Sequence, residues 1–516
     1  MSLPSLASWR NALEVYRKPQ AIAMLFLGFS AGLPLLLIFS SLSLWLREAG
    51  VERGAVTYFS WAALAYSFKF VWAPLIDTLP LPGLYTLLGR RRSWLLVAQL
   101  LIMTAIIMMG MTDPIDNLPM MALATVLLGL SAASQDIVID AYRIESAGDR
   151  LQAALAAMYI AGYRVGMLAS GAGALYLATW FGSDQTYSYQ AWRLTYLCMA
   201  MLMLVGVITT LSIREPAPNQ QREPYLHSGF DYLRFVMLFI TVTAVFILAF
   251  LQLGVAETVK SSLREGLGFN GVLAAFFGQS VQIAVAVALA AITARGLILV
   301  HAVNREMVRS TYVDPVADFF RRYARLALWV LLLVGFYRIS DIVLGVISNV
   351  FYFDMGYTKE QIASINKVLG LIMALLGGFI GGLLTTRFGI MRMLLSGAIL
   401  AAATNLLFML LASMEPNVPM LALVIAADNL CAGLASAAFI AYLSSLTSIS
   451  FTAVQYAIFS SLMTLFPKVL GGYSGGMVES LGYPGFFLFT ALLGVPVIGL
   501  ILYLMRREAT RVSSQA

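Results

Sequence analysis

Long apolar runs are the feature that most constrains what this chain can fold into. They recur along the sequence, each about 20 to 28 residues long, which is enough to cross roughly 30 Å of membrane hydrocarbon as a helix and longer than a barrel strand of about 10 residues. The chain is 60% hydrophobic and only 11% charged, whereas a soluble domain carries about 25% charged residues. The sequence therefore predicts an all-α polytopic membrane protein.

The polar connections between these runs differ in charge from one side of the membrane to the other. If the N-terminus is cytoplasmic, the inner segments hold most of the arginines and the outer loops hold few cations. Because cytoplasmic loops are enriched in Lys and Arg, this bias predicts two cytoplasmic termini, and it accounts for the net charge of +7 without a nucleic-acid partner. The fourteen expected spans are 20–46, 55–77, 93–112, 120–142, 153–180, 192–213, 235–256, 272–299, 326–349, 364–386, 390–412, 420–446, 452–476 and 484–505.

Two segments far apart in the sequence resemble each other. GLSAASQDIVIDAY at 129–142 lies 300 positions before NLCAGLASAAFIAY at 429–442, and the two share Leu, Ala and Tyr positions. With spans seven and eight set aside, six spans remain on each side, which resembles the two parallel six-helix halves of the major facilitator superfamily. The expected parts are an amphipathic surface segment with Trp9, Leu13 and Tyr16 on one face (1–18), an N-terminal bundle (19–213), linkers with an inserted helix pair (214–325), and a C-terminal bundle with a short tail (326–516).

Several residue types that enzymes use are scarce in this chain. Cys198 and Cys431 lie inside apolar runs, and the only histidines, His227 and His301, lie in loop-like segments. No HExxH motif and no phosphate-binding glycine loop followed by lysine is present, which disfavours a membrane-embedded transferase. A channel is disfavoured because the polar residues are spread over two halves and do not form a filter segment. We expect a transporter that is not an enzyme and needs no metal.

An acid and a basic cluster flank the loop between spans two and three. This pattern resembles the cytoplasmic loop signature of the superfamily, in which an acid at the end of the second helix meets basic residues entering the third. In the second half, Thr386 stands where the acid is expected, so we expect a weaker charged contact there. The alternative is that these arginines only follow the positive-inside rule. The residues of the first-half motif are Asp77, Gly89, Arg90, Arg91 and Arg92.

More specific motifs lie in the first half: LGFSAGLPLLLIFSSLSLWL, AYSFKFVWAPLID, GRRRSWLL, ASQDIVIDAYRIE and GYRVGMLASGAGALYLA. Together they resemble the AmpG family of muropeptide permeases, which is similar to the acetyl-coenzyme A transporters. The resemblance implies proton-driven import of anhydromuropeptides (GlcNAc-anhydroMurNAc peptides) from periplasm to cytoplasm, without a cofactor. We expect a monomer in the lipid bilayer of the bacterial inner membrane. The alternatives are a carrier of another anionic solute, such as acetyl-coenzyme A, or an exporter.

Charged residues inside the spans are the best candidates for function, because each costs at least about 2.5 to 3.5 kcal/mol at a helix centre and so needs a partner or a wet cavity. Lys69 and Asp136 lie at similar depths on spans two and four, so an ion pair between them is feasible. Gln135, Asp136, Asp140 and Arg143 form a polar ladder along one helix. Two interpretations stay open: a cavity wall that contacts protons and solute, or a clamp between helices.

A second group of charges falls near the expected midplane. Arg164 on span five and Arg338 on span nine come from opposite halves and are candidates for binding an anionic solute, together with Gln135, Tyr163 and Asn429. Arg338 and Asp341 are also spaced to neutralise each other. Asp428 and Lys468 lie at similar depths in the outer half and are interpreted as a gate or as static packing. For proton coupling, Asp136 is the first candidate, and Asp341 and Asp428 are the fallback candidates.

Overall fold

The computed structural model describes residues 14–51, 59, 64–183, 187–217, 229–269, 271–471 and 473–515. Within these ranges the chain is helical and contains no strand, and thirteen helices are long and apolar enough to span a membrane. The expected span 55–77 lies partly outside the described residues, as do residues 1–13 of the expected surface segment and His227. The helical membrane fold predicted from the apolar runs is confirmed.

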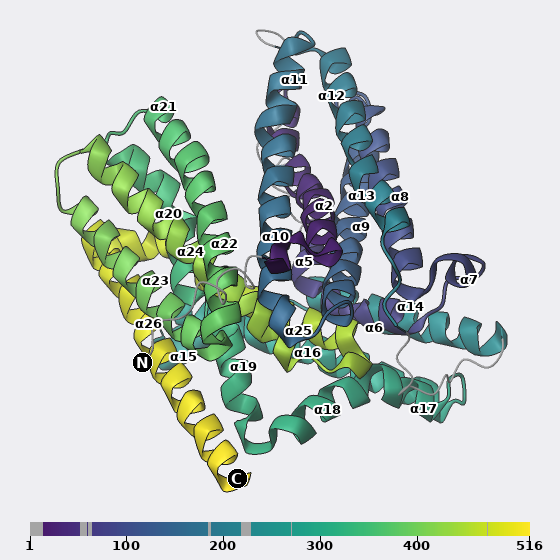
Figure 1. The fold of residues 1–516 in the computed structure, drawn as a ribbon. Helices are drawn as coiled ribbons and strands as arrows, with labels where there is room; N and C mark the ends of the chain where they lie inside the picture. Colours follow the sequence, from purple (N-terminus) through teal and green to yellow (C-terminus); the bar gives the residue numbers. More distant parts are fainter. Residues whose placement is uncertain are drawn as a thin grey trace.

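The N-terminal half contains the first group of helices. Figure 1 shows these helices together on one side of the molecule. They surround a core that includes Trp45, Trp192 and Tyr196, all of which are fully buried. The elements are α2 (Pro19–Leu36), α3 (Leu42–Glu48), α5 (Leu64–Phe68), η4 (Lys69–Val71), α6 (Ala73–Thr78), α7 (Leu84–Leu88), α8 (Arg90–Gly110), α9 (Leu118–Glu145), α10 (Asp149–Leu168), α11 (Ala174–Trp180), α12 (Tyr189–Leu202) and α13 (Leu204–Ser212), with η1 (Val15–Arg17) ahead of them.

The C-terminal half repeats this plan. Its expected ninth span, 326–349, is divided into α19 and α20 at Tyr337 and Arg338, where Arg338 leaves the helical conformation with a ψ of 10°. Its elements are α19 (Ala327–Phe336), α20 (Ile339–Asp354), α21 (Lys359–Ile362), α22 (Gly370–Phe388), α23 (Ile390–Ala412), α24 (Val418–Leu446), α25 (Thr452–Gly471) and α26 (Ser474–Gln515).

The starts of corresponding helices show that the 300-position repeat has a structural basis. Asn117 and Asn417 precede α9 and α24, and each side chain accepts a hydrogen bond from the third backbone N–H that follows it. Gly89 and Gly389 precede α8 and α23 with φ angles of 86° and 88°, which favour glycine. The same local chemistry therefore begins equivalent helices in both halves.

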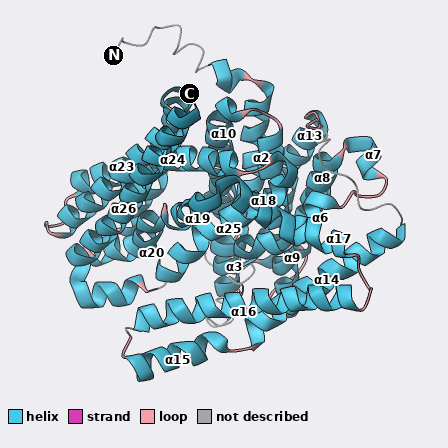
Figure 2. Cartoon of the chain, turned by 90° about the horizontal axis from the view of Figure 1, so that it is seen from below, coloured by secondary structure: helices cyan, strands magenta, loops and turns pink. Residues whose placement is uncertain are grey.

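The inserted segment lies at one edge of the molecule, as Figure 2 shows for α14 (Gly229–Gln252), α15 (Val255–Leu267) and α16 (Gly271–Leu299). The two spans in this segment have the smallest buried shares of all the candidate spans, 22% and 17%. On their inner side, Phe246 and Phe250 pack against Phe68, with ring centroids 5.6 and 4.8 Å apart. The insertion is therefore attached to the N-terminal half through α5. The short α17 (Arg305–Val308) and α18 (Asp314–Tyr323) then lead to the C-terminal half.

The two halves meet at the end of the molecule where α9 ends and α25 begins, which we call the base and which is at the bottom of Figure 1. Here α10 packs against α22 and α24, and α25 packs against α9 and α6. Towards α11 and α21, the ribbons of the two halves diverge (Figure 1). The polar residues at the base and along this interface form the candidate site.

Candidate functional site

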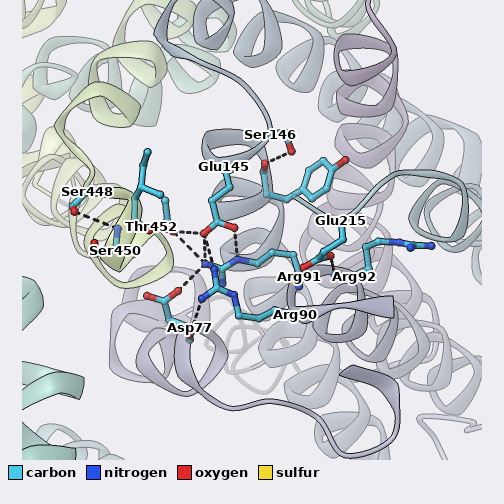
Figure 3. A network of polar contacts seen from close by, with 12 residues as sticks. Asp77, Arg90, Arg91, Arg92, Glu145, Ser146, Glu215, Ser448, Ser450 and Thr452 are labelled. Atoms are coloured by element: carbon cyan, nitrogen blue, oxygen red, sulfur yellow. Dashed lines mark hydrogen bonds and ion pairs between the residues drawn. The ribbon is translucent and has the colours of Figure 1, made fainter. Parts of the chain in front are cut away.

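At the base, side chains from three N-terminal helices converge on Arg91 in the first turn of α8 (Figure 3). The Arg91 guanidinium donates to Asp77 at 2.7 Å, and to the two oxygens of Glu145 at 2.5 and 2.9 Å. Arg90 also donates to Glu145, at 3.2 Å. The Arg91 and Asp77 side chains are each 1% exposed, so their charges depend on one another for compensation. We call this group, with Thr452, the latch network.

Thr452 connects the latch network to the C-terminal half. It is the first residue of α25; its hydroxyl accepts a hydrogen bond from Arg91 at 3.2 Å and donates one to Glu145. Figure 3 shows Thr452 facing the two charged side chains from the opposite half. The ion pairs therefore lie within the N-terminal half, and their hydrogen bonds to Thr452 hold α25 against them.

A carboxylate from the end of the N-terminal half caps α8. Glu215 accepts hydrogen bonds from the backbone N–H groups of Arg91 at 2.7 Å and Arg92 at 3.1 Å. These are unpaired donors at a helix N-terminus, where a negative charge is also favoured by the helix dipole. Gly89 has no room for a side chain here, because a Cβ atom would lie 2.4 Å from Cγ of Glu215. The cap therefore fixes the position of the Arg91 backbone, from which its side chain extends.

The structure supports the loop motif expected from the sequence and extends it. Asp77 and Arg91 pair as the motif predicts, whereas the Arg92 side chain donates to the carbonyls of Thr210 and Leu211. Sequence reasoning did not single out Glu145, Glu215 or Thr452. Glu145 closes the ASQDIVIDAYRIE motif and Glu215 directly follows Arg214, so both had a local signal. Thr452 had none, because its partner Arg91 is 361 positions away.

Further into the bundle, the polar ladder of α9 also links the halves. Lys69 pairs with Asp140 at 3.5 Å, which replaces the Lys69–Asp136 pair considered from the sequence, since Asp140 lies one helical turn nearer the base. Asp140 also pairs with Arg143 at 3.3 Å. Arg143 is fully buried and donates to Ser444 of α24 at 2.7 Å. For Asp140 and Arg143, this geometry is that of a clamp.

Asp136 has a different environment, although it lies on the same helix. It is 8% exposed and accepts a hydrogen bond from Tyr159 at 3.3 Å, and the Tyr159 ring lies 5.9 Å from that of Tyr163. The neighbouring Gln135 is fully buried, and neither polar atom of its amide has a hydrogen-bond partner among the described residues. Among the described residues Asp136 therefore has no direct ion pair, and it faces the Tyr159 hydroxyl of α10.

The two arginines expected near the midplane come from the two halves. Arg164 lies on α10, and Arg338 lies at the break between α19 and α20. Their positive charges are near enough to interact across the interface. Arg338 also lies 3.7 Å from Asp341, so the mutual neutralisation considered from the sequence is present for this arginine. Both arginines are partly exposed.

The gate expected between Asp428 and Lys468 is replaced by other contacts. Asp428 accepts a hydrogen bond from Thr404 at 3.2 Å within the C-terminal half. Lys468 is exposed and donates to Ser67 of the N-terminal half at 3.5 Å. Asn429 donates to the carbonyl of Ile425 in its own helix. The sequence places Asp428 and Lys468 at similar depths by counting along two helices. Depth alone does not determine which faces of the two helices contact each other.

The comparison with known families defines the class of protein. The sequence profile of the Major Facilitator Superfamily matches residues 20–306, more than half of the chain, and the chain therefore belongs to this superfamily of membrane transporters. The predicted fold is confirmed by solved structures. The fucose:proton symporter of Escherichia coli aligns with a TM-score of 0.59 at 11% identity, covering 94% of this chain and 98% of that one. A proton:xylose symporter aligns with a TM-score of 0.55 at 12% identity, covering 95% of each chain.

Among curated proteins, the chain is similar to the AmpG group. It is 29% identical over 491 residues to the putative transporter AmpG 4 of Rickettsia conorii, covering 95% of this chain and 98% of that protein. It is also 29% identical over 506 residues to the anhydromuropeptide permease of Escherichia coli K12, covering 97% of this chain and 83% of that protein. The resemblance found in the first-half motifs is thus confirmed over nearly the whole chain.

Proposed function

We propose that this multi-pass membrane transporter imports anhydromuropeptides from the periplasm to the cytoplasm, driven by the proton gradient. The similarity to a protein named anhydromuropeptide permease, over 97% of this chain, supports the cargo class. In this proposal the protein is a monomer in the bacterial inner membrane, has both termini in the cytoplasm and uses no cofactor. The observation that carries the mechanism is the latch network, which joins the halves at the base.

In the proposed mechanism the base is the cytoplasmic end, and the structure corresponds to a state closed to the cytoplasm. Cargo enters between the diverging halves and contacts Arg164 and Arg338. Its peptide carboxylates are anionic, and a guanidinium group binds a carboxylate through two parallel hydrogen bonds. The halves then close around the cargo, and the contacts of Arg91 and Glu145 to Thr452 break as the base opens.

Proton coupling is assigned to Asp136. A buried carboxylate favours its neutral form, and it becomes charged more readily when water or a cation approaches. Lys69 lies on the facing helix and is engaged by Asp140, so rearrangement of that pair changes the electrostatic field at Asp136. In this proposal Asp136 binds a proton in one state and releases it in the other.

The direct test is uptake of labelled anhydromuropeptide into right-side-out vesicles, with and without an imposed proton gradient. We expect uptake above the equilibrium level only when the gradient is present, and none in vesicles without the protein. The same vesicles are tested with labelled acetyl-coenzyme A, and inside-out vesicles are tested for efflux. Accumulation of acetyl-coenzyme A alone, or transport only in the efflux direction, would show that the cargo or the direction is assigned wrongly.

A further inference from the structure

Tyr16 connects the two halves at a place separate from the latch network. It lies in the short η1 turn, three residues before α2 begins, and it is 9% exposed although it precedes the first span. Its hydroxyl donates to the backbone carbonyl of Phe379 on α22, at 3.0 Å. Its ring lies 4.5 Å from that of Phe379. A side chain ahead of the first membrane helix of the N-terminal half is therefore bound to the C-terminal half.

The surroundings of Tyr16 are shaped to admit it. The ring packs in a buried cluster with Ala154 and Ala157 of α10 and with Ala437 of α24. Next to it on α22 is Gly382, where a Cβ atom would lie 2.5 Å from the Tyr16 hydroxyl and 2.9 Å from the Ala157 methyl group. Small residues from three helices of both halves thus leave a space that the tyrosine fills. A tyrosine hydroxyl is neutral at physiological pH, and burial raises the pKa of the Tyr16 hydroxyl further, so it acts as a neutral hydrogen-bond donor.

We propose that Tyr16 forms a reversible contact with α22, called the pin below, that holds the base closed. When the base opens, the segment ahead of α2 must withdraw Tyr16 from this contact. The inference rests on the proposed alternating access, in which α10 moves away from α22 and the ring is released. The Tyr16 contact holds the two halves together by interactions of a different kind from those of the latch network. The latch depends on charge, whereas the pin depends on shape, apolar burial and one neutral hydrogen bond.

The test uses spin labels at Leu87 on α7 and Arg507 on α26, two exposed base positions on opposite halves, after replacement of Cys198 and Cys431. Pulsed electron paramagnetic resonance then gives the ratio of base-open to base-closed molecules without cargo. Tyr16→Phe removes only the hydroxyl. Since a hydrogen bond contributes about 0.5 to 1.5 kcal/mol, this ratio should rise about two- to twelvefold, and it should rise further in Tyr16→Ala.

The matched control is Tyr196→Phe, because Tyr196 also donates to a helix carbonyl, that of Leu37 at 3.1 Å, but within the N-terminal half. It should leave the ratio unchanged. A ratio in Tyr16→Phe and Tyr16→Ala equal to that of Tyr196→Phe would overturn the pin. Adding anhydromuropeptide to the wild-type protein tests alternating access separately, because that measurement does not involve Tyr16. Gly382→Ala should raise the ratio when Tyr16 is present. It should raise the ratio less in the Tyr16→Ala background, because the clash between the added Cβ and the Tyr16 hydroxyl is absent there.

Discussion

Glu145 illustrates how much one side chain contributes at the base. It accepts hydrogen bonds from Arg90, Arg91 and Thr452, and therefore both neutralises the buried arginine and reaches the other half. Glutamine in its place keeps the shape but removes the charge. Hydrogen bonds to charged groups contribute about 1.5 to 3 kcal/mol each, more than neutral ones.

We predict that Glu145→Gln shifts the protein towards the base-open state by roughly tenfold to a hundredfold, from the loss of at least one charged hydrogen bond. The measurement is the distance distribution between the labels at Leu87 and Arg507. Glu257→Gln is the control, because Glu257 is 77% exposed and pairs with Lys260 on the same helix, α15. An unchanged distribution in Glu145→Gln would show that the latch network does not hold the base closed.

At Arg164 the prediction concerns cargo. Replacing it with glutamine should weaken uptake of anionic anhydromuropeptide by about ten- to a hundredfold in affinity, because one charged hydrogen-bonding partner is lost. Arg164→Lys should restore only part of the loss, since lysine lacks the planar fork of two donors. Cargo with amidated carboxyls should be affected much less. If both cargoes weaken equally, Arg164 has a structural role and the anion is bound elsewhere.

Replacing Asp136 is predicted to remove proton coupling without stopping the conformational change that carries cargo. Asp136→Asn should abolish accumulation against a gradient but retain some exchange of labelled for unlabelled cargo, because the amide cannot carry a proton between states. Asp113→Asn is a suitable control, since Asp113 precedes α9 at the end opposite the base. The measurements are uptake and counterflow in the same vesicles. Fully coupled uptake by Asp136→Asn would remove Asp136 from the proposed role.

At the scale of helices, α2 and α10 of the N-terminal half approach each other closely. A Cβ atom on Gly162 of α10 would lie 1.8 Å from the carbonyl oxygen of Leu25, and one on Gly28 of α2 would lie 2.2 Å from that of Tyr159. The C-terminal half has a similar contact between α22 and α24, where a Cβ on Gly377 would lie 2.0 Å from the carbonyl of Leu430. Backbones in such contact cannot slide without separating, so each pair behaves as one body.

Gly162→Ala should therefore destabilise the N-terminal half, by about 1 to 3 kcal/mol for overpacking. Gly296→Ala on α16 is the matched control, because no atom of the described residues beyond its chain neighbours and its own helix backbone lies within 4 Å of the added Cβ. That change should be neutral or stabilise the helix by about 1 kcal/mol. The measurement is the thermal unfolding midpoint of each purified variant in detergent. Equal midpoints would indicate that α2 and α10 are less tightly packed in solution.

The elements were predictable from sequence because hydrocarbon thickness fixes their length, and thirteen of the expected spans correspond to long apolar helices. The motif at Asp77 and Arg91 was predictable because it is local. The break at Arg338 was not, since neither residue flanking it is glycine or proline. The pairing of Lys69 with Asp140 and the role of Thr452 depend on how separate helices rotate against each other. Local patterns and periodicity in a single sequence do not show this rotation.

For the whole molecule, two rigid halves that meet at the base predict opposite changes at the two ends. Tyr176 on α11 and Phe353 on α20 are 78% and 61% exposed and lie on different halves, so both positions can carry spin labels. We expect their separation to shorten in the same molecules in which the separation between Leu87 and Arg507 lengthens. The measurement is made in the presence and absence of cargo. Base opening with no change between Tyr176 and Phe353 would indicate bending within a half.

The close glycine contacts also affect how inactive variants should be interpreted. The 28 residues of α9 extend about 42 Å at 1.5 Å per residue, so a half that moves as one body acts as a lever of that length. A substitution near either tip then changes exposure at the other without touching it. Residues whose replacement abolishes uptake will therefore include those along the moving half and at its two ends as well as those that bind cargo. Affinity for cargo, measured on a state locked by cross-linking, distinguishes the cargo-binding residues from the others.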